Sequence, residues 1–206
     1  WGAPARTAAP RGAYVQVSAG VAHSCAVPSD EKVICWGDEV DLQLDPPTDI
    51  AKQDETFTSV ATGGASRAWN DNGDDWPLGA SACALRRDGS IDCFGGGGSP
   101  PVGEFVALAV GPRAGCALDG DGALHCWPTA AREGVSLPPE SLSSETVTDV
   151  SIGFDLGCAI KSDGALVCWD NGMNIGGTPP SGAFSAVSVS GSRYLPGTGE
   201  AFDPDF

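Results

Sequence analysis

Eight cysteines are the residues of this 206-residue sequence with the best-defined chemistry, and they form four pairs of identical spacing. In every pair, nine residues separate the two thiols. Zinc knuckles use cysteines that lie much closer together, and no Cys-x-x-Cys redox motif occurs. Two interpretations are left: disulfides, which we favour, and reduced cysteines buried in a cytosolic protein.

The residues between the cysteines are typical of a β-hairpin. Asp88-Gly89 lies midway between Cys83 and Cys93, which predicts a three-residue turn with a left-handed glycine. The two cysteines then face each other at a non-hydrogen-bonded pair, where Cα atoms are about 4.5 Å apart and a disulfide can form. The same register predicts four bridges: Cys25–Cys35, Cys83–Cys93, Cys116–Cys126 and Cys158–Cys168. Each would contribute roughly 2.5–3 kcal/mol, and all require an oxidising compartment, so a secreted or cell-surface protein is expected.

No catalytic residues are assigned from the sequence. The two histidines, His23 and His125, fall at different positions of different hairpins, and a serine such as Ser24 would have to converge with one of them. Hydrogen-bonded structural histidines are the simpler interpretation. The glycine run at 95–98 does not match a phosphate-binding loop. The protein is therefore expected not to be an enzyme.

One insertion, residues 64–82, breaks the regular spacing of the chain. It holds Trp69 and Trp76, which flank an acidic stretch containing Asp71, Asp74 and Asp75. Dense oxygen ligands around a glycine suit calcium, although the spacing is not that of an EF-hand. The alternatives are a plain solvated loop and a contact site for protein or glycan that uses Trp69 and Trp76. No cofactor is required, and calcium is the one candidate.

The hairpins belong to a longer repeat. A short apolar strand, a glycine, a cysteine hairpin and a proline pair follow one another in the first four units, and a fifth unit lacks cysteines. The units span residues 14–47, 57–101, 105–139, 147–180 and 184–206 plus 1–10. Repeats of this length with several short strands indicate a β-propeller or a solenoid. We expect residues 1–206 to form a single all-β domain, a propeller of about five four-stranded blades.

The two ends of the chain are complementary. The fifth unit lacks the final Trp-Gly of the others, and the sequence begins with Trp1-Gly2. Closing a sheet removes an exposed strand edge, which would otherwise pair with other chains. An N-terminal strand is therefore expected to close the last blade, with Trp1 beside residues 201–206 of the same chain or of a neighbouring one. Self-assembly is one consequence of this expectation.

Charge and hydropathy restrict the partners. A net charge of −16 disfavours nucleic acid and anionic membrane surfaces. No apolar run reaches the length of about 18 residues that a membrane span needs.

One aromatic residue recurs in register in each of the first four units: Trp36, Phe94, Trp127 and Trp169. This recurrence indicates packing within or between repeats rather than a ligand cage.

Two segments carry a family resemblance. Gly153 to Trp169, with its Cys-Ala-Ile, Asp-Gly and Cys-Trp elements, and Gly20 to Gly37 resemble the regulator of chromosome condensation repeat. The cysteines and proline pairs are similar to those of secreted bacterial members. The resemblance implies a propeller, typically of seven blades, and functions that range from nucleotide exchange and chromatin binding to light sensing and β-lactamase inhibition. The negative charge contradicts chromatin binding.

These observations leave three functional hypotheses. The first is a secreted, non-enzymatic recognition propeller for a protein or carbohydrate ligand. The second is a structural subunit of an extracellular assembly, with strand exchange between chains. The third is a secreted inhibitor of the β-lactamase-inhibitor type. Because one fold hosts many functions, the sequence does not name the ligand.

Overall fold

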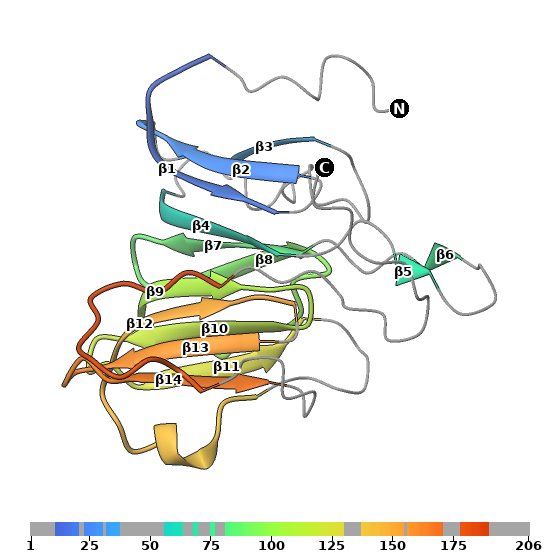
Figure 1. Ribbon diagram of the computed structural model, residues 1–206. Helices are drawn as coiled ribbons and strands as arrows, with labels where there is room; N and C mark the ends of the chain where they lie inside the picture. The colour runs from blue at the N-terminus through green and yellow to red at the C-terminus, as the bar shows by residue number, and fades with distance from the viewer. Residues whose placement is uncertain are drawn as a thin grey trace.

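Figure 1 shows the computed structural model of the chain, which describes residues 11–20, 23–30, 32–37, 56–63, 68–69, 75–76, 81–129, 137–154, 156–170 and 178–189. These ranges contain fourteen strands, one 3-10 turn and no α-helix. No helix within them is long and apolar enough to cross a membrane. The elements are β1 (Tyr14–Ala19), β2 (His23–Pro28), β3 (Ile34–Gly37), β4 (Phe57–Gly63), β5 (Ala68–Trp69), β6 (Asp75–Trp76), β7 (Ser81–Arg86), β8 (Ile91–Gly95), β9 (Phe105–Val110), β10 (Ala114–Asp119), β11 (Leu124–Pro128), η1 (Glu140–Leu142), β12 (Val147–Ile152), β13 (Leu156–Lys161) and β14 (Leu166–Asp170).

Twelve of these strands form four antiparallel, three-stranded sheets, and β5 and β6 form a separate short ladder. The sheets are β1-β2-β3, β4-β7-β8, β9-β10-β11 and β12-β13-β14, and each lies within one sequence unit. We refer to them as repeats one to four. The all-β expectation is confirmed, whereas the described residues show three strands in each repeat rather than four.

The hairpin turns have the expected geometry in repeats two to four. In repeat two the Arg86 N–H donates to the Ser90 carbonyl (2.8 Å), and the Gly89 N–H donates to the Arg86 carbonyl (3.0 Å). Gly89 has a φ of 86°, and the equivalent glycines of repeats three and four have φ of 80° and 84°. In repeat one Pro28 takes the place of Arg86, and a proline has no N–H to close the turn in this way.

Aspartates cap two of these turns. The Asp88 carboxylate accepts the Ser90 hydroxyl (2.6 Å) and the Ser90 N–H (2.9 Å), and Asp163 accepts the Ala165 N–H (2.9 Å). These hydrogen bonds to the charged form hold the pKa of both carboxyl groups below the usual value. The Asp-Gly dipeptide therefore stabilises the turn in two ways. The aspartate carboxylate accepts a backbone N–H of the turn, and the glycine adopts a positive φ.

Every hairpin is closed by a disulfide between directly opposite residues. The bonds join Cys25 to Cys35, Cys83 to Cys93, Cys116 to Cys126 and Cys158 to Cys168. These are the partners that the hairpin register predicts. The paired Cα atoms are 4.0–4.1 Å apart, somewhat closer than the 4.5 Å expected for such a pair.

Each repeat has two faces of different composition. The disulfide face carries the cysteines and the aliphatic residues near them, and the aromatic face carries the first residue of the first strand and the Trp or Phe of the third. In the core the disulfide face of one repeat packs on the aromatic face of the next. Between repeats one and two, this joint contains Cys25, Val27, Val33, Cys35, Phe57, Val60, Ala82, Ala84 and Phe94.

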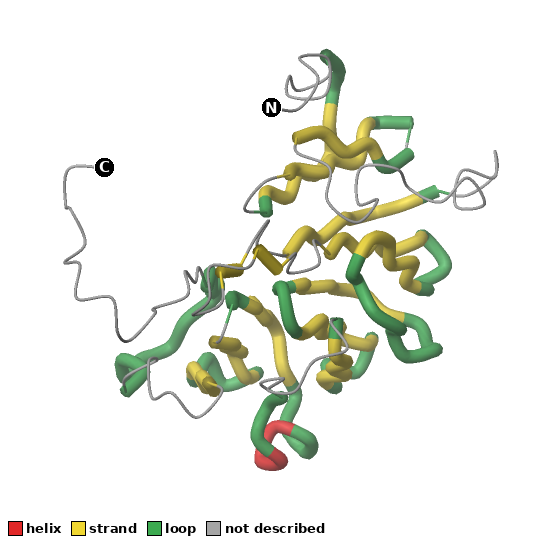
Figure 2. The backbone as a smooth tube through the Cα atoms, turned by 90° about the vertical axis from the view of Figure 1, so that its right-hand side faces the viewer, coloured by secondary structure: helices red, strands yellow, loops and turns green. Residues whose placement is uncertain are grey.

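Figures 1 and 2 show the sheets following one another in chain order around a common centre, where the first strands β1, β4, β9 and β12 lie against one another. Polar side chains join some of these strands. The Gln16 amide of β1 pairs with both backbone groups of Val60 in β4 (2.9 Å each). The Ser18 hydroxyl accepts the Thr62 N–H (3.0 Å).

Residues 178–189 continue the series as the start of repeat five, although no strand is assigned there. Asp149 and Ser151 of β12 accept the N–H groups of Val187 (2.8 Å) and Val189 (2.9 Å), at the same positions that Gln16 and Ser18 occupy in repeat one. The Phe184 N–H donates to the Gly164 carbonyl (2.9 Å), as the first residues of repeats three and four do to the preceding turn. The predicted closure by Trp1 beside residues 201–206 lies outside the described residues.

Candidate binding face

The connections from the first to the second strand of each repeat emerge at the same end of the molecule. A Cβ atom on Gly63, at the end of β4, would lie 2.5 Å from the carbonyl carbon of Gly111. A Cβ atom on Gly111 would lie 2.6 Å from the carbonyl oxygen of Gly153. Because these glycines end the first strands of repeats two, three and four side by side, the loops that follow them share one surface. We call this surface the loop face.

The long insertion is the connection of repeat two on the loop face. Within it β5 and β6 pair antiparallel, with Ala68 opposite Trp76 and Trp69 opposite Asp75. In Figure 1 this ladder stands apart from the stacked sheets. The backbone therefore brings the two sequence-predicted tryptophans and one of the three aspartates onto neighbouring strands.

The calcium prediction for Asp71, Asp74 and Asp75 stays a prediction. Asp71 and Asp74 lie outside the described residues, and Asp75 is placed in β6. Among the residues that the structure does describe, no group of three or more His, Cys, Asp or Glu is arranged to hold a metal ion.

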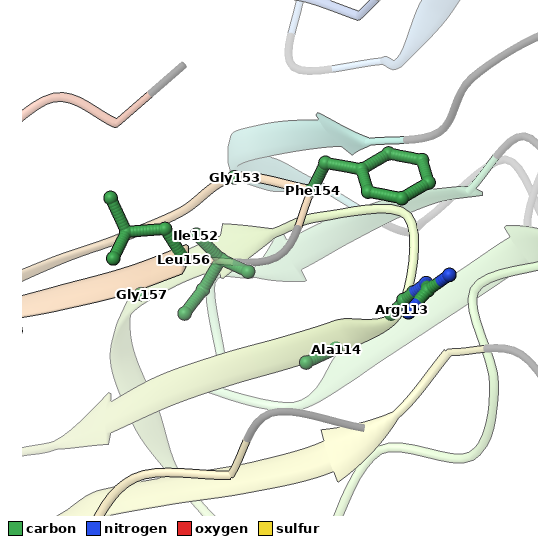
Figure 3. A pocket seen from close by; sticks show the side chains of 7 residues that line it. All are labelled: Arg113, Ala114, Ile152, Gly153, Phe154, Leu156 and Gly157. Carbon is green, nitrogen blue, oxygen red and sulfur yellow. The ribbon is translucent and has the colours of Figure 1, made fainter. Parts of the chain in front are cut away.

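Repeats three and four contribute a small depression to the loop face, shown in Figure 3. The Arg113 guanidinium lies over the Phe154 ring, 4.9 Å from its centre, in a cation–π contact. The depression is lined by Arg113, Ala114, Ile152, Gly153, Phe154, Leu156 and Gly157. Its volume of about 10 Å³ is room for about one water molecule, so this depression suits surface contact rather than a buried small molecule.

Arg113 and Phe154 were not among the sequence-predicted site residues. Each follows soon after the glycine that ends a first strand, which is the signal that could have placed them on the same surface.

His23 begins β2 next to the loop face and is 3% exposed. Its ring is hydrogen-bonded to the Ser81 backbone, as expected of a structural histidine, whereas its Nε2 atom has no hydrogen-bond partner among the described residues. Burial lowers the pKa of His23, and a hydrogen bond with the Ser81 backbone opposes this effect. The imidazole is thus neutral in the folded protein near neutral pH.

This lowered pKa predicts a pH dependence of stability. Below about pH 6.5 the unfolded chain binds a proton at His23 that the folded chain does not, so the free energy of unfolding falls as the pH falls. Urea denaturation at pH 7 and pH 5 measures the slope. In His23→Gln the free energy of unfolding should change less between pH 7 and pH 5 than in the wild type. The turn aspartates do not replace this effect, because they titrate at much lower pH. An equal slope in the wild type and His23→Gln would contradict the prediction.

His125 has a structural environment in repeat three. Its Nε2 atom lies 2.9 Å from Asp119 Oδ2, and its ring packs edge-on against Phe105 with centroids 5.5 Å apart. This hydrogen bond is the main cause of the lowered pKa of Asp119. The Asp119 carboxylate also accepts the Ala123 N–H (2.9 Å), so the pair supports the hairpin turn.

Residues 14–43 match the regulator of chromosome condensation (RCC1) repeat. The match begins at the first residue of β1 and includes the whole of repeat one, so the family resemblance noted in the sequence is confirmed there. No curated protein matches the chain.

Solved structures share the fold of these four repeats. The ectodomain of the Physcomitrella patens receptor kinase CR4 is 20% identical, with a TM-score of 0.68, over 90% of this chain and 49% of that one. The CRINKLY WD40 ectodomain of the Arabidopsis thaliana receptor kinase ACR4 is 18% identical, with a TM-score of 0.56, over 76% and 53%. Human WBSCR16 is 15% identical, with a TM-score of 0.56, over 79% and 49%. The chain therefore has a propeller-like fold and spans about half the length of these structures.

Proposed function

We propose that the protein is a non-enzymatic recognition module of the extracellular space that binds a protein ligand through its loop face. The observation that carries this proposal is where the 64–80 insertion joins the fold. It connects Gly63 at the end of β4, on the loop face, to Ser81 of β7, whereas only Pro112 and Arg113 follow Gly111 in the same connection of repeat three. Long loops on rigid scaffolds are common binding elements.

The chemistry of the loop face suits a protein surface. Trp69 and Trp76 lie on paired strands, and Trp is among the residues that contribute most to protein interfaces. Arg113 stacked on Phe154 adds a second aromatic and cationic contact on the same surface. The net charge of −16 favours a ligand whose contact surface is basic.

Two further observations support an extracellular location. The four disulfides fit an oxidising compartment, and two of the similar solved structures are ectodomains of receptor kinases. Nucleic acid is disfavoured as a ligand by the negative charge.

Affinity capture from extracellular medium tests the proposal. The immobilised protein is compared with a variant in which residues 64–80 are replaced by the Pro-Arg dipeptide that makes the same connection in repeat three. A Trp69→Ala/Trp76→Ala variant keeps the loop length. We expect one extracellular protein to bind the wild type, and both variants to lose affinity by about 30-fold or more.

Asp121→Ala is the matched control, because Asp121 lies in the hairpin turn at the opposite end of repeat three. It should bind as the wild type does. If the two loop variants bind the captured protein as tightly as the wild type does, the loop face is not the binding surface. A glycan-array signal without any protein ligand would overturn the ligand class.

A further inference from the structure

The buried polar side chains among the described residues gather in one layer beneath the loop face. This layer consists of His23, Thr62, Ser81 and Thr129, and each of them is at most 8% exposed. Thr62 is the last residue but one of β4, and Ser81 is the first residue of β7. The 64–80 insertion therefore leaves the fold and re-enters it within this polar layer.

Hydroxyl groups of the polar layer make hydrogen bonds between repeats. The Ser18 and Thr62 hydroxyls lie 2.9 Å apart, which links repeats one and two. The Ser81 hydroxyl donates to the Gly111 carbonyl of repeat three (3.0 Å), which also accepts the Thr129 hydroxyl (3.3 Å). A displacement of Ser81 would therefore disturb both the base of the insertion and the joint between repeats two and three.

His23 is the member of this layer whose charge can change between pH 5 and pH 7. Its buried Nε2 atom has no hydrogen-bond partner among the described residues, so the ring nitrogen that is bonded to the Ser81 backbone is Nδ1. The ring also lies against Gly20, where a Cβ atom would be 3.2 Å from Cε1. The Gly20 N–H closes the turn before β2 by donating to the His23 carbonyl (2.8 Å). The imidazole is thus held between this turn and the first residue of β7.

The strands around His23 offer no negative charge to a protonated ring. Neither β3 nor β4 contains a charged residue, and the ionisable groups Tyr14 of β1 and Arg86 of β7 lie at the opposite ends of their strands. A proton on Nε2 would add a charge and a donor without an acceptor, and both are unfavourable when buried. The ring gains this proton where water reaches Nε2, which requires the Gly20–His23 turn to move away from Ser81.

We propose that protonation of His23 opens the loop face between the Gly20–His23 turn and Ser81, and that this opening speeds the release of the protein ligand in acidic medium. The opening is argued from the contacts above, whereas its effect on the ligand rests on the proposed function. An exposed histidine has a pKa of about 6.5, so the open state binds more protons than the closed state and gains population as the pH falls. Between pH 7 and pH 5 this gain is at most about 25-fold.

Amide hydrogen exchange at pH 7 and pH 5 tests the opening without any ligand. After correction for the intrinsic exchange rate, the protection of the Gly20 N–H should be about 10- to 25-fold lower at pH 5. The Gly89 N–H, which donates to the Arg86 carbonyl in the hairpin turn of repeat two (3.0 Å), is the internal control and should keep its protection. Equal protection of Gly20 at the two pH values would overturn the proposal.

Two histidine variants separate the effect of His23 from other effects of pH. In His23→Gln the protection of the Gly20 N–H should be the same at both pH values, because glutamine does not titrate in this range. His125→Gln is the matched control, since the His125 side chain is 43% exposed and contacts Asp119 beside the turn of repeat three. It should keep the pH dependence of the wild type. A pH dependence that persists in His23→Gln, or that disappears in His125→Gln, would overturn the assignment to His23.

The protein captured in the affinity experiment tests the effect on release. From pH 7 to pH 5 its dissociation rate should rise about 10-fold more from the wild type than from His23→Gln. Equal changes in the two proteins would show that the opening does not control release, and would overturn that part of the proposal. If no protein is captured, the proposed function fails and the effect on release fails with it, whereas hydrogen exchange still decides whether the loop face opens.

Discussion

Replacement of both Cys83 and Cys93 by alanine is expected to lower the free energy of unfolding by roughly 3 kcal/mol. The bridge closes a loop of sequence separation 10, for which the chain-entropy model gives about 2.5–3 kcal/mol. Cys83 is also fully buried in the joint between repeats two and three, so its loss removes packing there. For a chain of this size the melting temperature should fall by about 6–12 °C.

The bridge of repeat four provides the comparison for this variant. Cys158 and Cys168 have the same sequence separation of 10, and the Cys158 side chain is 4% exposed. Their double alanine variant should lose a similar amount of stability. Thermal unfolding of the two variants and the wild type, without reductant, measures both effects. A melting temperature unchanged in both variants would show that the bridges are absent or carry no stability.

Gly63→Ala is expected to destabilise the joint between repeats two and three by about 2–3 kcal/mol. The added Cβ atom would lie 2.5–2.7 Å from three backbone atoms of Gly111. Backbone on both sides cannot move aside as a flexible side chain could, so the two repeats would have to separate. The Ser81 hydroxyl, which donates to the Gly111 carbonyl (3.0 Å), would lose its geometry as well.

Gly120→Ala is the matched control for this substitution. No atom lies within 4 Å of a Cβ at Gly120, and Gly120 is not among the glycines with positive φ. Its stability in urea should equal that of the wild type or exceed it slightly. If Gly63→Ala and Gly120→Ala unfold at the same urea concentration, the close approach of the two strands is wrong.

The hairpins could be predicted from the sequence because their determinants are local. The Asp-Gly dipeptide fixes the turn between Cys83 and Cys93, and the turn fixes which residues face each other. Opposite Trp127 and Trp169 lie Gly115 and Gly157, where a Cβ would fall 2.3–2.4 Å from the indole ring. The recurrence of these aromatic residues therefore reports packing, as expected.

The contacts between repeats could not be predicted in the same way. The side chains of Gln16 and Asp149 each accept a backbone N–H from the first segment of the following repeat, although their residue types differ. Repeats two and three have serine and alanine at this position. No sequence period marks such a contact. On the loop face, Trp69 and Trp76 stood out because they interrupt the repeat, whereas Arg113 was missed because it is a single residue in a short turn.

Four repeats, each closed by its own bridge, form the scaffold on which the loop face depends. Peptide mapping by mass spectrometry, after proteolysis without reduction, tests this scaffold most directly. The expected result is four linked pairs, Cys25–Cys35, Cys83–Cys93, Cys116–Cys126 and Cys158–Cys168, and no free thiol. A bridge that joins cysteines of two different repeats would contradict the repeat architecture and the loop face derived from it.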